Sequence, residues 1–255
     1  MSRFLISRTI ILITVFLLTA CGPRQATINI TETPKIHTSS TKNITVHIIN
    51  ITDSREFVLN SDNPTLPQLA TVKDIGPVIT STAAAQIRDS IGNVIFDIFT
   101  EKKITDIVKS AVEESFERAG YNVSNSATNA IPVDVNITQF WSYNTVGAWA
   151  MYYFHFDISV EITGILPVLK EQQRYSSNIK LRSAWARTPQ SFKNTISKGM
   201  DKFIRDLATQ LSKNNFYDDG VDEYYSPHEQ IDPKEKKGLI DSFDDGEEYY
   251  SPPGK

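Results

Sequence analysis

The alternation of apolar and polar side chains is strictest between residues 151 and 165. Every second position there is apolar, and the positions between them are mostly polar. A period of two over this length predicts a strand in a sheet with one face buried and the other in water. Shorter runs of the same kind predict further strands at residues 43–52, 133–141 and 174–184. The apolar positions of the long strand are Tyr152, Phe154, Phe156, Ile158, Val160 and Ile162.

Two segments have apolar residues spaced by three or four and therefore predict amphipathic helices. The first covers residues 101–119, with Thr100 as the expected N-cap and Gly120 just beyond the end. The second begins at Thr188-Pro189, where threonine can cap and proline suits the first helical position. Its apolar stripe consists of Phe192, Ile196, Met200, Phe203, Leu207 and Leu211.

Other segments give weaker patterns. Residues 83–99 carry apolar side chains at every fourth position, which suits a helix, but Gly92 and several β-branched residues weaken that prediction, so helix and strand both stay open. Residues 78–82 are β-branched enough for a brief strand, and residues 27–30 for another. Residues 144–147 are the expected turn between the second and third long strands. Gly199 either weakens the last helix or permits close packing there.

The predicted order is strand, helix, three antiparallel strands and helix. Consecutive strands joined by short turns are usually antiparallel neighbours. Two amphipathic helices can then cover one face of the sheet. The sequence therefore predicts an α+β fold with two layers, an antiparallel sheet and two helices on one of its faces.

The first twenty residues form a separate unit. Arg3 and Arg8 are followed by an apolar run of about half the ~20 residues that a membrane-spanning helix needs. Leu18-Thr19-Ala20 then precedes Cys21, the single cysteine of the chain. This order is typical of a secretory signal peptide, and its end resembles a bacterial lipobox. The resemblance implies cleavage before Cys21 and acylation of that residue.

The remainder divides by composition into three parts. Residues 21–42 are polar and read as a lipid anchor with a flexible linker, and residues 43–213 contain the predicted globular domain. Residues 214–255 hold 12 Asp and Glu against 4 Lys, and they repeat an Asp-Asp-Gly…Glu-Tyr-Tyr-Ser-Pro motif twice. This acidic tail, which lacks apolar periodicity, is predicted to be disordered.

Residues 21–213 resemble the YajG-type lipoproteins of Gram-negative bacteria. The resemblance rests on the lipobox, a strand that ends in Asp53-Ser54-Arg55, a helix end that runs into Gly120-Tyr121, the strand at 133–139, and the order of the last elements. Residues 56–99 look longer than the family pattern, and the repeated tail is an addition. The resemblance implies the fold and an outer-membrane location, which Gly22 after the cysteine also favours. It transfers no active site.

No residue pattern indicates catalysis, a metal or a cofactor. His37, His47, His155 and His228 are scattered and lack metal-ligand spacing. His155 and Asp157 share one face of the long strand, which is more typical of surface polarity than of an acid–base site. Nucleotide and hydrolase fingerprints are absent from the sequence. The near-neutral domain and acidic tail also argue against nucleic-acid binding.

An aromatic stretch around the expected turn is the candidate for partner binding. It contains Trp141, Tyr143, Trp149 and Tyr153. These rings either fold back on the sheet or form an exposed patch for a partner or membrane. We expect Trp141 to be core and Trp149 to be a contact.

Together these features predict a lipid-anchored periplasmic binding or scaffolding module in the outer membrane of a Gram-negative envelope. The expected partner is an envelope protein, and no enzymatic activity is expected. The alternative is an accessory lipoprotein subunit of an envelope transport or secretion complex. An envelope hydrolase ranks third, and it would require a deep pocket with convergent ionisable groups.

Overall fold

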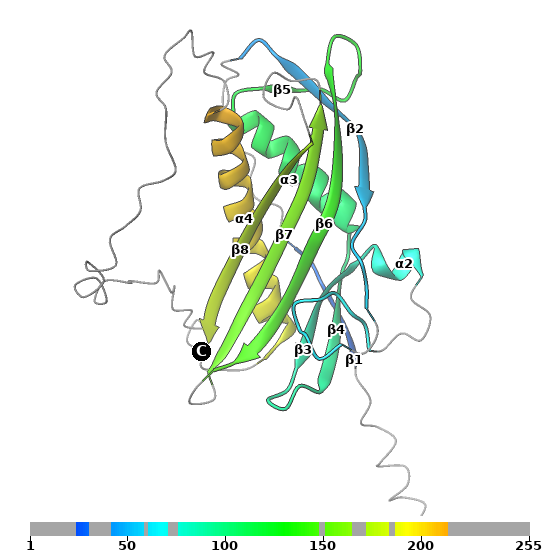
Figure 1. The fold of residues 1–255 in the computed structure, drawn as a ribbon, viewed down its shortest axis with the longest axis vertical. Coiled ribbons are helices and arrows are strands. Elements are labelled where there is room, and N and C mark those ends of the chain that lie inside the picture. Colours follow the sequence, from blue (N-terminus) through cyan, green and yellow to red (C-terminus); the bar gives the residue numbers. More distant parts are fainter. Residues whose placement is uncertain are drawn as a thin grey trace, which may run out of the picture.

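Strands dominate the computed structural model of the chain, which describes residues 24–30, 42–58, 61–70, 76–147, 151–164, 172–183 and 187–213. The predicted α+β class is confirmed. The signal segment, Cys21, most of the linker, Trp149 and the acidic tail lie outside the described residues. In chain order the elements (Figure 1) are β1 (Arg24–Ile28), β2 (Thr45–Asp53), α2 (Pro77–Thr80), β3 (Ala83–Arg88), β4 (Val94–Thr100), α3 (Ile104–Arg118), β5 (Asn122–Val123), β6 (Ile131–Val146), β7 (Tyr152–Gly164), β8 (Gln173–Ser183) and α4 (Pro189–Lys213).

The sheet is organised around β6, which is 16 residues long. One side of β6 pairs in parallel with β2 and, further along, with β3. The other side pairs antiparallel with β7 over its whole length, and β7 pairs antiparallel with β8. The predicted antiparallel arrangement of the three long strands is therefore confirmed. The sheet as a whole is mixed, because β1 lies parallel to β4 and β2 parallel to β5.

A β-bulge interrupts β6 between Ile137 and Gln139. Before the bulge, odd-numbered residues such as Val135 and Ile137 point into the core. After it, even-numbered residues such as Phe140 pair with the core positions of β7, and Trp141 pairs with Asp157. The extra residue thus reverses which side chains of β6 point inward.

The two long helices lie on one side of the sheet and contact each other, as Figure 1 shows: α4 packs on β6, β7 and β8, and α3 packs on β2, β5 and β6. Gly199 of α4 faces Phe156 of β7, and a side chain at position 199 would collide with that ring. The glycine therefore permits close packing of helix on sheet. Thr188 accepts a hydrogen bond from the Ser191 N–H at 3.3 Å, as a capping residue does, and Gly120 ends α3 with a φ of 89°.

Residues 83–99 form a β-hairpin, β3 and β4, rather than a helix. The apparent helical period arises because Ile87 lies in one strand, Ile95 in the other, and Ile91 in the turn, where it is 82% exposed. Asp89 builds this turn by accepting hydrogen bonds from the Ile91 and Asn93 N–H groups. Gly92 supplies the positive φ of 91° that the turn requires.

Three local predictions were wrong. Residues 77–80 form the short helix α2 instead of a strand, because Pro77 suits the first helical turn. Lys103 rather than Thr100 is the N-cap of α3, and the Thr100 hydroxyl instead donates to the Lys102 carbonyl. The expected turn at residues 144–147 belongs largely to β6. The hairpin closes later, through a 2.8 Å hydrogen bond from the Gly147 N–H to the Met151 carbonyl.

Candidate functional site

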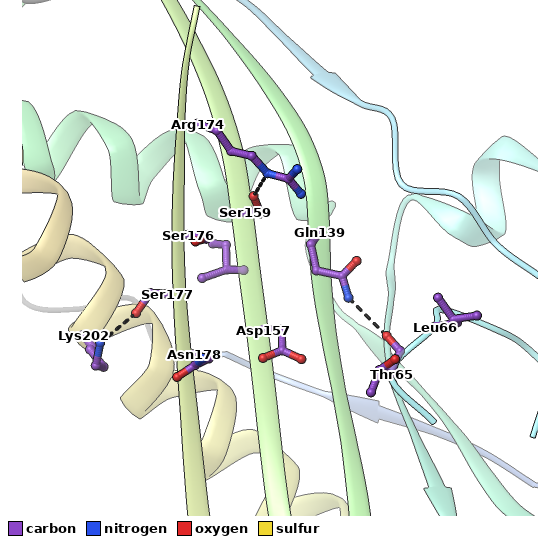
Figure 2. Close-up of a pocket in the computed structure, with 11 residues that line it drawn as sticks. Thr65, Leu66, Gln139, Asp157, Ser159, Arg174, Ser176, Ser177, Asn178 and Lys202 are labelled. Atoms are coloured by element: carbon purple, nitrogen blue, oxygen red, sulfur yellow. Dashed lines mark hydrogen bonds between the residues drawn. The ribbon is translucent and has the colours of Figure 1, made fainter. Parts of the chain in front are cut away.

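We call the face of β6–β8 that points away from the helices the outer face. A groove of about 610 Å³ runs across it and continues past the edge of β8 to Lys202 of α4. Register places Asp157 opposite Asn178, and Ser159 opposite both Gln139 and Ser176. Hydroxyl, amide and charged groups therefore form the floor of the groove. Figure 2 labels the lining residues Thr65, Leu66, Gln139, Asp157, Ser159, Arg174, Ser176, Ser177, Asn178 and Lys202, and Ile158 completes the lining.

One wall of the groove is formed by residues 61–70, which we call the covering loop. Trp141 donates its indole N–H to the Pro64 carbonyl at 3.1 Å, and the Gln139 amide donates to the Thr65 carbonyl at 3.2 Å. The Trp141 ring also meets Phe57 edge-on, with centroids 6.1 Å apart. The loop therefore buries Trp141 completely although this residue lies on the outer face.

A buried polar network holds the covering loop to the β3–β4 hairpin. Asp97 is fully buried and accepts hydrogen bonds from the Ala70 N–H at 2.9 Å and the Gln86 amide at 3.0 Å. Arg88 bonds to the Gln86 side chain and donates to the Ser61 carbonyl at 2.7 Å. Burial lowers the pKa of Arg88 below its usual value. These bonds fix one wall of the groove relative to the sheet.

Arg55 connects the strands behind this wall. Its guanidinium is completely buried and pairs with Asp53 at 2.7 Å. The same group donates to the carbonyls of Thr80, Ala83 and Phe140 at 2.7, 2.7 and 3.0 Å. The Asp53-Ser54-Arg55 motif therefore ties β2 to α2, β3 and β6 with charge-assisted hydrogen bonds, which is a structural role.

Tyr143, His155 and Asp157 form a cluster beside the groove. The rings of Tyr143 and His155 stack with centroids 4.7 Å apart, and Tyr143 also shares a hydrogen bond with Asp157. Burial raises the pKa of Tyr143 to about 12, and it also raises the pKa of Asp157. Burial and the Lys180 charge lower the pKa of His155 to about 4, so this ring is neutral near pH 7.

The cluster does not have the connections of an acid–base site. His155 bonds through Nε2 to the Thr145 hydroxyl at 2.9 Å, whereas Asp157 bonds to Tyr143. The carboxylate therefore does not orient the imidazole, as a catalytic relay requires. A pKa near 4 also makes His155 a weak base at neutral pH. The geometry suits recognition through hydrogen bonds and ring faces.

The predicted site residues are only partly brought together. Tyr143 and Tyr153 are half-buried on the outer face, and the Lys180 ammonium lies over the Tyr153 ring at 4.3 Å. Trp141 is buried, as expected, although the covering loop rather than the helices buries it. Trp149 and Cys21 lie outside the described residues.

Sequence reasoning missed Arg174, Lys180, Arg182 and Lys202. The first three occupy even-numbered positions of β8, so the alternation of that strand alone could have predicted that they share one face. Lys202 joins them because α4 packs beside β8, where its ammonium lies 3.3 Å from the Ser177 hydroxyl and 2.7 Å from Asp206. That juxtaposition depends on tertiary packing.

Within the described ranges, no group of three or more His, Cys, Asp or Glu side chains could hold a metal ion. Among the helices of that same part of the chain, none is long and apolar enough to span a bilayer.

No family model and no curated protein sequence matches the chain. Solved structures do resemble it. A Xanthomonas campestris protein described by the family model DUF330 is 10% identical, with a TM-score of 0.42, over 74% of this chain and 96% of that one. A minor lipoprotein from Acinetobacter baumannii is 11% identical, with a TM-score of 0.33, over 51% of this chain and 90% of that one.

Proposed function

We propose that the chain is a lipid-anchored periplasmic module that binds an envelope protein through the outer-face groove and performs no catalysis. The observation that carries this proposal is the groove itself, open to solvent and walled by the covering loop. Acyl chains on Cys21 would hold the module in the outer membrane, as the lipobox and the YajG resemblance imply. Each buried CH₂ adds ~0.8 kcal/mol to membrane affinity, so several chains give a lasting anchor.

The composition of the outer face supports binding to protein. Tyrosine and arginine are enriched at the energetic centres of protein interfaces, because they combine a large apolar area with hydrogen bonding. The groove and its margin present Tyr143, Tyr153, Arg174 and Arg182. Serine, asparagine and glutamine on the floor offer donors and acceptors to a partner backbone.

An accessory subunit of an envelope transport or secretion complex is the second candidate. It is favoured by β8, which in the described part of the chain pairs with β7 alone. A partner strand could add to the other edge of β8 and form a continuous interface. Co-purification with a complex at fixed stoichiometry would distinguish this role from a more transient scaffold.

The test is site-specific photocrosslinking in intact envelopes. A benzoylphenylalanine replaces Ser176 in the groove, and in a control it replaces Val78, which is 82% exposed on α2. We expect a discrete crosslinked envelope protein from position 176 and not from position 78. Equal crosslinking from both positions, or none from 176, would contradict the proposal.

Anchoring is tested separately with Cys21→Ser. We expect this variant to leave the membrane fraction or to accumulate as unprocessed precursor, measured by fractionation and immunoblot. Mature-sized protein that still fractionates with membranes would show that Cys21 is not the anchor.

A further inference from the structure

Charge is distributed very unevenly along this chain. Residues 173–213, which contain β8 and α4, hold 9 Lys and Arg against 2 Asp. Residues 21–172 hold 11 Lys and Arg against 16 Asp and Glu, so most of the globular part is acidic. The tail that follows α4 directly holds 12 Asp and Glu against 4 Lys. The most basic and the most acidic segments are therefore neighbours in the chain.

The structure gathers part of this basic charge at one edge of the sheet. β8 carries three cationic side chains and no acidic one, and α4 packs beside it. Lys202 of α4 and Arg174 of β8 both line the groove. We call these groups the basic edge, which consists of Arg174, Lys180, Arg182 and Lys202.

Three acidic groups accompany this edge: Asp157 and Glu161 on the neighbouring strand β7, and Asp206 on α4. Asp206 pairs with Lys202 at 2.7 Å, and Asp157 bonds to Tyr143. Glu161 accepts hydrogen bonds from the amides of Asn136 and Gln172 at 3.0 and 2.7 Å. Hydrogen bonds from neutral donors leave the charge of a carboxylate unchanged, so the four cations of the basic edge and these three carboxylates together carry a surplus of one positive charge.

We propose that the acidic tail, residues 214–255, docks on the basic edge of its own chain. Lys202 lies 11 residues before the end of α4, which is about 17 Å along the helix. An extended chain spans about 3.3 Å per residue, so the first tail motif, residues 217–227, reaches the edge easily. Tethering also keeps the local concentration of the tail in the millimolar range, so weak contacts suffice.

The tail motif matches the edge in more than charge. Each copy places two tyrosines directly after its acidic residues. Two cations of the domain already lie over tyrosine rings, since Lys180 is 4.3 Å from the Tyr153 centroid and Arg187 is 4.7 Å from that of Tyr152. Carboxylates and ring faces together are attractive partners for such cations.

Docking of the tail would regulate the groove. This consequence rests on the proposed function, because the tail would occupy a surface that an envelope partner also needs. A partner with higher affinity would displace the tail, and removal of the tail would make the groove more available.

The test uses the full-length mature lipoprotein in detergent micelles at low concentration. Benzoylphenylalanine replaces Asn178 on β8 or, as a control, Val78 on α2, and crosslinked peptides are identified by mass spectrometry. We expect position 178 to crosslink to residues 214–255 of the same chain, with a yield that is independent of dilution. Raising the salt to about 0.5 M should reduce that yield several-fold, because exposed charge pairs are screened.

Two sets of variants sharpen the result. Charge reversal of the edge by Arg174→Glu, Lys180→Glu and Arg182→Glu should reduce the crosslink yield about fivefold or more. The matched control, Lys103→Glu with Lys109→Glu on α3, should leave it unchanged. Neutralising the first motif with Asp218→Asn, Asp219→Asn, Asp222→Asn and Glu223→Gln tests the same contact without altering the folded domain.

Crosslinks between different chains, to another surface, or in equal yield from position 78 would overturn the proposal, as would no loss of yield in the neutralised tail. This outcome is separable from failure of the proposed function. A chain truncated after Lys213 should still crosslink an envelope protein from position 176, whether or not the tail docks.

Discussion

The two faces of β7 share one backbone and differ in almost everything else. Phe154, Phe156 and Ile158 point toward the helices and are at most 1% exposed, so packing alone explains them. Tyr153, His155 and Asp157 alternate with them on the outer face and are half-buried among polar groups. The inner face is defined by apolar side chains at every second position of the strand. The outer face acquires its character from register, the covering loop and the neighbouring basic residues, which come from distant parts of the chain.

The largest expected effect comes from the inner face. Phe156→Ala should lower the free energy of unfolding by ~3–5 kcal/mol, because it leaves a cavity between β7 and α4. Asp157→Asn, one residue away on the outer face, should change it by less than ~1 kcal/mol. Chemical denaturation measures both, and similar losses would mean that the two faces contribute equally to stability.

Trp141 is an exception to the contrast between the two faces, because it is fully buried although it lies on the outer face. Trp141→Phe should cost about 1–2 kcal/mol, because it removes the bond to the Pro64 carbonyl and part of the volume under the covering loop. Trp149→Ala should change stability by less than ~0.5 kcal/mol while weakening partner crosslinks, if Trp149 is a contact. A loss of ~3–5 kcal/mol for Trp149→Ala, with unchanged crosslinks, would instead place that ring in the core.

Titration provides a smaller effect that is specific to the outer face. The pKa of His155 is lowered to about 4 in the folded protein, against ~6.5 unfolded, so the unfolded chain binds more protons between these values. Stability should therefore fall as the pH drops from 6.5 toward 4. Because His155 is partly exposed, we expect a loss of only about 1 kcal/mol.

His155→Gln should flatten this part of the stability profile, measured as denaturation midpoints at pH 7 and pH 4.5. Asp157 acts in the opposite direction, because its raised pKa favours the folded state as the pH falls further. An unchanged slope in His155→Gln would mean that another group controls this pH window.

The smallest effect is expected from the tail. Truncation after Lys213 should shift the unfolding midpoint by no more than about 2 °C, since an acidic segment that docks weakly buries little apolar area. Thermal denaturation of the truncated and full chains measures the shift. A drop of ~5 °C or more would show that the tail is an integral part of the folded domain.

Sequence periodicity predicted the elements that bury one continuous face. It identified β7, α3 and α4 because their apolar spacing repeats over many residues. It left the β3–β4 hairpin ambiguous, because Ile87, Ile91 and Ile95 mimic a helical repeat across a turn. Such coincidences are resolved only by pairing with other strands.

The site was harder to predict for a related reason. Arg55 binds carbonyls 25 to 85 residues away, and Asp97 bonds to Ala70 and Gln86 across the fold. No local sequence pattern predicts hydrogen-bond partners that lie so far apart in the chain. Of the aromatic residues noted in the sequence, Tyr143 and Tyr153 lie on the outer face and Trp141 lies under the covering loop, whereas Trp149 is outside the described residues. The basic residues of β8 form a group with Lys202 only because α4 packs beside that strand.

The bulge in β6 has a genetic consequence. Thr138 is the residue that the neighbouring strand leaves unmatched between Ile137 and Gln139. Loss of that single codon would remove the bulge and restore strict alternation, with Ile137 and Phe140 still pointing inward and Gln139 outward. Substitutions along β6 alter this surface one residue at a time, whereas loss of a codon from a regularly paired part of β6 would exchange the two sides of the strand beyond that point at once. Related chains should therefore tolerate many replacements in β6, and a change in its length only at the bulge.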